Sequence, residues 1–69
     1  MGVGDWYREK NEAQSEYDNA RITRDVYEIR TRFAIGMIYK WGNVSDKEAA
    51  ERMAKAHGYD INELINIVS

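Results

Sequence analysis

The segment 5–41 combines a regular helical pattern with almost nothing that would interrupt a helix. The chain contains no proline, the residue that most strongly ends helices, and Gly36 is the one glycine in this segment. From Ala13 to Trp41 a stripe of positions recurs at alternating steps of four and three residues, the spacing of one helical face. It consists of Ala13, Tyr17, Ala20, Arg24, Tyr27, Thr31, Ala34, Ile38 and Trp41. No strand pattern competes with it, so the sequence predicts an all-α fold.

A second stripe lies beside the first and widens the predicted apolar face from about residue 22 onward. It consists of Ile22, Val26, Ile29, Phe33 and Met37. Together the two stripes form the richest apolar surface that the sequence offers. We therefore expect this face to be buried, with Phe33 and Trp41 among the core residues.

A single helix over 5–41 would be about 55 Å long, which is too long for a compact domain of 69 residues. We expect either a break near 15–20 or an extended helix that pairs with another chain. Ser15 and Asp18 have the spacing of a weak capping box and mark the candidate break. We place a helix over about 15–41, and 5–14 is its extension, a short separate helix or a frayed arm.

The second half of the chain has clearer helix boundaries. Gly42 follows the long helix and is able to take the left-handed conformation that ends helices. Ser45 and Glu48 have the spacing of a capping box for a helix over 46–57, which Gly58 ends.

The last predicted helix covers 61–68, opened by a capping box of Asp60 and Glu63. The predicted architecture is thus one long helix, kinked, broken or continuous, followed by a short two-helix hairpin in a small helical bundle. We expect a single domain over 1–69, with a flexible N-terminus at 1–4.

The composition excludes several kinds of site. The chain has no cysteine and one histidine, His57, so disulfides and cysteine-based zinc sites are impossible. We predict no metal site and no cofactor. Neither a secretory signal nor a membrane-spanning segment is apparent, and we expect a cytoplasmic protein that does not bind a membrane. Because so small a core supplies only about 3–5 kcal/mol, we expect a partner, either another protein or a second copy.

Charge changes sign along the predicted long helix. Segment 5–18 holds five acidic and two basic residues, whereas 21–32 holds four arginines and two acidic residues. This order suits the helix dipole, and it also suits two such helices lying antiparallel. The alternatives are a solvated face with local pairs, such as Glu28 with Arg32, and antiparallel pairing of two chains. Arg24 lies on the apolar stripe, so burial would require a carboxylate partner, unless the side chain extends to the edge of the core.

Few residues are suited to catalysis. His57 has Asp60 three residues away, but no nucleophile accompanies it. Glu9, Glu12 and Glu16 share a helical face without the Glu-x-x-His pattern of a di-metal bundle. We therefore predict no enzymatic activity and no small-molecule substrate.

The C-terminal hairpin resembles the outline of a helix-turn-helix over about 20 residues. Its second helix contains Glu63 and no lysine or arginine, which disfavours DNA. Four arginines near Tyr27 form a weak candidate patch for single-stranded nucleic acid. Nucleic acid is therefore the less favoured partner.

Aromatic side chains in the acidic N-terminal segment are the candidate binding residues. Trp6, Tyr7 and Tyr17 have little predicted core to join, so they are either covered by the C-terminal hairpin or contact another protein. The candidate protein-binding residues are Trp6, Tyr7, Tyr17, Arg21, Arg24 and Tyr27. We expect a non-catalytic adaptor or inhibitor of a larger protein, of the kind found among accessory proteins of phages and mobile elements. The alternatives are a helix-turn-helix-like DNA-binding regulator and a structural homo-oligomer formed by antiparallel pairing of the long helix.

Overall fold

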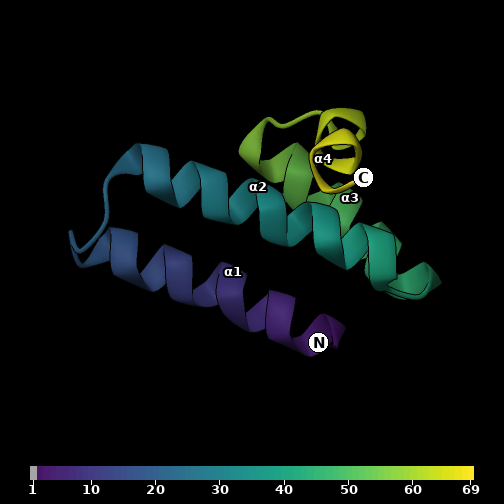
Figure 1. Ribbon diagram of the computed structural model, residues 1–69, viewed down its shortest axis with the longest axis horizontal. Helices are drawn as coiled ribbons and strands as arrows, with labels where there is room; N and C mark the ends of the chain where they lie inside the picture. The colour runs from purple at the N-terminus through teal and green to yellow at the C-terminus, as the bar shows by residue number, and fades with distance from the viewer. Residues whose placement is uncertain (1) are drawn as a thin grey trace.

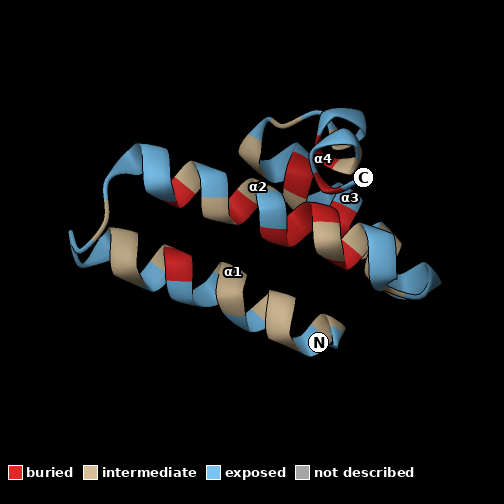
Figure 2. Ribbon diagram, viewed as in Figure 1, coloured by how far each residue is buried: buried red, intermediate tan, exposed pale blue. Residues whose placement is uncertain are grey.

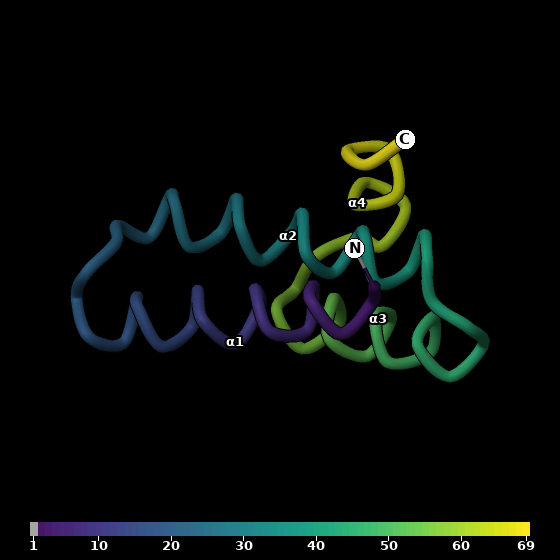
Figure 3. Tube along the Cα trace, turned by 60° about the horizontal axis from the view of Figure 1, so that its bottom comes forward, coloured from purple at the N-terminus to yellow at the C-terminus, as the bar shows by residue number. Residues whose placement is uncertain are grey.

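The computed structural model of the chain describes residues 2–69, and it confirms the all-α prediction. This part of the chain forms four helices (Figure 1). They are α1 (Val3–Asp18), α2 (Arg24–Trp41), α3 (Val44–His57) and α4 (Ile61–Val68). The expectation of one long helix over 15–41 is wrong, because α1 and α2 are separate helices that lie antiparallel (Figures 1 and 3).

The chain reverses at 19–23, which overlaps the alternative of a break near 15–20. Ser15 and Asp18 belong to the last turns of α1 rather than to a helix start. The backbone N–H of Ala20 donates to the carbonyl of Tyr17, and that of Arg21 donates to the carbonyl of Glu16. This is the Schellman pattern, with Ala20 at its left-handed position (φ 58°). Glycine usually occupies that position, so an alanine there gives no sequence signal of a helix end.

Helix α2 is the centre of the fold, and the other three helices pack against it. In Figures 1 and 3, α1 and α4 lie on opposite sides of α2, while α3 returns along it. The central cluster of buried side chains joins α2 to α3 and α4. It consists of Ile35, Ile38, Ala50, Ala54 and Leu64. Figure 2 shows the buried residues concentrated on the parts of α2 that the other helices cover, with Ala13 as the buried residue of α1.

The close approach of α4 to α2 depends on Gly36. A Cβ atom at this position would lie 2.7 Å from the carbonyl oxygen of Leu64 and 2.9 Å from Cγ1 of Val68. The missing side chain therefore lets the backbone of α4 rest directly on α2. Gly36, the one glycine within the segment 5–41, is therefore required for the packing of α4 on α2.

The remaining helix ends differ in detail from expectation. Gly42 has an extended backbone (φ −84°, ψ 168°), so the predicted left-handed end is wrong. The capping box of α3 is formed by Asn43 and Asp46 instead of Ser45 and Glu48, and the helix begins at Val44. Gly58 takes the left-handed conformation at φ 77°. Helix α1 begins at Val3, inside the segment expected to be flexible, and Met1 lies outside the described residues.

We predict that Gly36→Ala destabilises the fold by roughly 1–3 kcal/mol, because the new methyl group must push α4 away from α2. This loss exceeds the gain of about 1 kcal/mol in helix propensity. Gly4→Ala is the matched control, because nothing lies within 4 Å of a Cβ at that helical position. Urea denaturation measures both variants. Equal stability of the two would contradict the proposed role of Gly36.

We predict that Ala20→Gly stabilises the fold by about 1 kcal/mol, since glycine adopts the left-handed conformation without the steric cost that alanine has. Ala56→Gly, in the last turns of α3, is the control and is expected to lose about 0.5–1 kcal/mol. Thermal unfolding of both variants distinguishes these effects. A loss of stability in Ala20→Gly would show that the reversal does not strain this residue.

Candidate functional site

Two of the candidate binding residues, Trp6 and Tyr7, pack inward from the first turns of α1. Both are half-buried against the central cluster. The ring centroid of Trp6 lies 5.5 Å from that of Phe33 on α2. The hydroxyl of Tyr7 donates a hydrogen bond to Oδ1 of Asp46 on α3 (3.0 Å), and burial together with this bond raises the pKa of Tyr7. These side chains therefore help to hold α1 on the rest of the molecule.

Tyr17 and Tyr27 form a stacked pair that joins the C-terminal end of α1 to the N-terminal end of α2. Their ring centroids are 4.6 Å apart and the rings are inclined by 15°. Tyr27 is 9% exposed, and its hydroxyl donates to Oε1 of Gln14 (2.6 Å). Little of the Tyr27 ring is left for a partner to contact.

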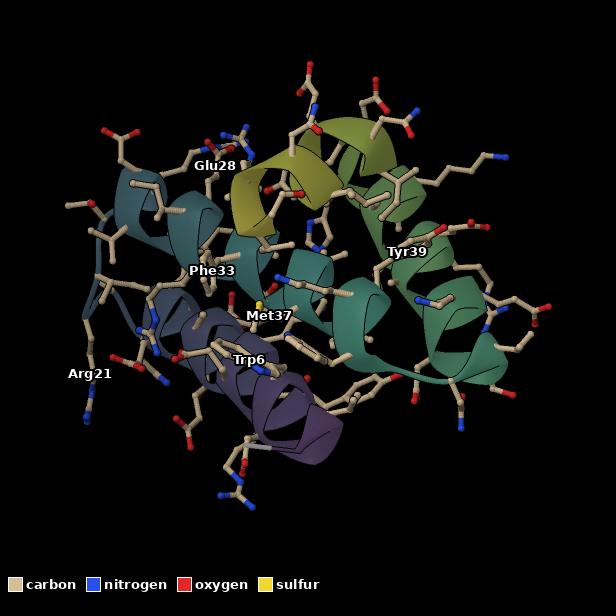
Figure 4. All side chains as sticks on the ribbon, turned by 45° about the vertical axis from the view of Figure 1, so that its right-hand side comes forward. Trp6, Arg21, Glu28, Phe33, Met37 and Tyr39 are labelled. Atoms are coloured by element: carbon tan, nitrogen blue, oxygen red, sulfur yellow. The ribbon has the colours of Figure 1, made fainter. Side chains whose placement is uncertain are left out.

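The two arginines among the candidate binding residues, Arg21 and Arg24, are both exposed. Arg24 is not buried: its side chain is 75% exposed and contacts Glu28 one turn further along α2. Arg21 is exposed in the reversal between the first two helices. Trp6 and Tyr7 lie near the start of α1, whereas the two arginines lie beyond its end, and Figure 4 shows Arg21 well apart from Trp6.

Arg30 is the central charged residue between α1 and α2, and it was not among the candidates. Its guanidinium donates to Oε1 of Glu9 through Nε (3.0 Å) and through Nη2, and to Oε2 of Glu16 through Nη1 (2.9 Å). These bonds raise the pKa of Arg30. The acidic first segment and the basic second segment thus meet inside one chain. One reading of the charge order was antiparallel pairing between two chains, whereas the structure forms the contact within one chain, and no residue spacing identified Arg30.

The ring of His57 lies among aromatic side chains. Its ring stacks on Tyr59 with centroids 5.3 Å apart, and Tyr27 approaches from the edge at 6.4 Å. Burial, and then the charge of Lys10, lower the pKa of His57. The neutral form is therefore favoured, although the position at the end of a helix would favour the charged form. Within residues 2–69, no group of three or more histidine or acidic side chains is arranged to hold a metal ion.

The second apolar stripe of α2 is exposed, which overturns the expectation that it joins the core. Ile29 is 66%, Val26 41% and Phe33 39% exposed. Ile22 and Met37 are half-buried at the two ends of the stripe. We call these five residues the apolar face. Ile22 lies in the reversal just before α2, and the other four point roughly 125° round the helix axis from the buried residues Tyr27, Thr31, Ala34 and Ile38.

The packing of the helices explains why this face is uncovered. Helices α1 and α4 flank α2 on two sides and α3 packs on a third, so the strip of α2 between α1 and α4 stays uncovered at Ile29. Figure 4 shows Phe33 and Met37 on α2 in the strip between α1 and α4, with Trp6 at the edge formed by α1. Trp41, which was expected in the core, is 62% exposed at the end of α2.

We predict that stability falls as the pH drops from 7 to 5 partly through His57. Because its pKa is lower in the folded state, the unfolded chain takes up a proton first, from about pH 6.5 downward. The loss is complete once the pH is below the pKa of the folded state. His57→Phe keeps an aromatic ring on Tyr59 and is expected to flatten this dependence in denaturation experiments. An unchanged pH profile would contradict the assignment.

Comparison with known proteins adds no assignment to this geometry. No family model matches the chain, and no curated protein or solved structure shows a significant match. None of the described helices is long and apolar enough to cross a membrane. The function must therefore be argued from the apolar face and the charges beside it.

Proposed function

We propose that the chain is a non-catalytic module that binds another protein through the apolar face of α2. The observation that carries the proposal is the exposure of Val26, Ile29 and Phe33 on one side of a helix. Large apolar side chains exposed singly are common, but a contiguous stripe of them is typical of an interaction surface.

The fold holds this face in a fixed position. Helix α2 is packed on by all three other helices, so its exposed stripe needs no ordering when a partner arrives. Full burial of such a side chain from water contributes about 1.5–3 kcal/mol, so covering the exposed remainder contributes up to about 2 kcal/mol at Ile29 and about 1 kcal/mol at Phe33. An apolar face that the fold holds in place supports an adaptor or inhibitor that acts by binding.

Of the candidate binding residues predicted from the sequence, only Trp6 borders the apolar face. Trp6 lies at the edge of the apolar face through its contact with Phe33. Tyr7, Tyr17 and Tyr27 engage other side chains of the chain. Their use in binding, like that of the exposed Arg21 and Arg24, stays a prediction.

We predict that Ile29→Asp weakens partner binding at least tenfold, because it places a charge in the middle of the apolar face. Stability should change by only about 0.5 kcal/mol, since the side chain is exposed. Val44→Asp is the matched control, an exposed aliphatic residue at the start of α3 and outside the face. Affinity capture from the source cells, read by mass spectrometry, compares the three chains.

A partner retained by the wild type and by Val44→Asp but lost by Ile29→Asp is the expected result. Trp6→Ala should weaken the same partner to a smaller degree, because Trp6 borders the face. Retention of every captured protein by Ile29→Asp, or capture of none by the wild type, would contradict the proposal.

A further inference from the structure

The charges beside the apolar face restrict what can cover it. Four carboxylates on α1 recur at steps of four, three and four residues and share one side of that helix. They are Asp5, Glu9, Glu12 and Glu16. We call them the acidic stripe.

The acidic stripe runs along one edge of the apolar face. Two contacts fix this placement. Arg30, the neighbour of Ile29, binds Glu9 and Glu16, and Trp6 contacts Phe33. Glu12 lies between the two carboxylates that Arg30 binds and is exposed.

Arg30 does not neutralise this edge. It shares its charge between two carboxylates, and their side chains remain 35% and 38% exposed. Arg8 reaches Asp5 only at 3.8 Å with a side chain that is 72% exposed. A partner that lies on the apolar face therefore meets excess negative charge along α1.

We infer that the apolar face receives an amphipathic helix of another protein whose apolar stripe is bordered, on the side facing α1, by lysine or arginine. This inference rests on the proposed function and names the chemistry of its partner. A helix fits because the part of the face on α2, from Val26 to Met37, is straight and about 16 Å long, and its side chains have the spacing into which the ridges of a second helix pack.

A second copy of the chain fits this face less well. Antiparallel pairing of two apolar faces would set the acidic stripe of one copy against that of the other, and like charges so placed are unfavourable. In a parallel pair, α1 of one copy would meet α4 of the other. Both helices flank the face at the same level, α1 where Trp6 contacts Phe33 and α4 where it crosses Gly36, so they would keep the two faces apart. A nucleic acid or an anionic membrane would likewise meet negative charge.

The test uses two designed helical peptides, about five turns long, with the same leucine stripe. One carries lysines along one edge of that stripe and the other carries glutamates at the same positions. We expect the lysine peptide to bind the full chain about tenfold more tightly at low salt, with the advantage decreasing as salt is added. Isothermal titration calorimetry measures both affinities.

Charge variants of the chain locate the binding site. Glu12→Lys should weaken binding of the lysine peptide several-fold and strengthen binding of the glutamate peptide. Glu51→Lys makes the same change in net charge on the exposed side of α3 and should leave both affinities near those of the wild type. Ile29→Asp should abolish binding of both peptides.

The outcomes separate this inference from the proposed function. Equal binding of the two peptides, lost in Ile29→Asp, would support the apolar face as a docking site and overturn the basic partner. Binding of the lysine peptide that survives Ile29→Asp would place it elsewhere and count against both. Failure of both peptides to bind more tightly than about 1 mM overturns the inference. A dimer in sedimentation of the chain alone that dissociates in Ile29→Asp, or binding to anionic lipid vesicles, would also overturn it.

Discussion

The reversal of the chain at 19–23 determines how the rest of the molecule can pack. By ending α1 at Asp18 and starting α2 at Arg24, it turns what would be a helix of about 55 Å into an antiparallel pair. The stacked Tyr17 and Tyr27 and the contacts of Arg30 with α1 then hold the pair together. With α1 in place, α3 and α4 have only the remaining sides of α2 to cover. The packing of all four helices therefore depends on one short reversal, in which Ala20 takes the left-handed conformation.

One consequence of this arrangement is that the three other helices do not surround α2 completely. The stripe through Tyr27 and Ile38 is buried, whereas the stripe through Ile29 and Phe33 stays exposed. The same hairpin places the carboxylates of α1 beside the exposed stripe, because Arg30 draws Glu9 and Glu16 towards it. An apolar face with one acidic edge follows from how the hairpin closes, and the proposals on binding follow from that face.

The sequence predicted the elements of the fold more successfully than their arrangement. Helical spacing and the lack of proline were sufficient for the all-α class, because helix periodicity is a local property. A break near 15–20 was one of two alternatives, and α1 ends at Asp18 within that range, but the sequence did not select it because Ala20 occupies a site where glycine is usual. The spacing of two adjacent apolar stripes does not indicate which one the other helices will cover, and this explains the wrong expectation for Phe33. Trp41 lies on the covered stripe, but it is the last residue of α2 and is exposed there. The role of Arg30 depends on residues 14 and 21 positions away, and only the charge order hinted at it.

The antiparallel pairing of α1 with α2 within one chain is the central claim, and a distance measurement between spin labels tests it most directly. Because the chain has no cysteine, labels can be placed specifically at Gly4→Cys and Trp41→Cys, both at exposed positions. The longest dimension of the molecule is 33 Å, so the account predicts a label separation near or below that value, unchanged when excess unlabelled chain is added. A separation of about 55 Å would mean a continuous helix. A short distance that disappears on dilution with unlabelled chain would mean that α1 packs on a different molecule, and either result would contradict the account.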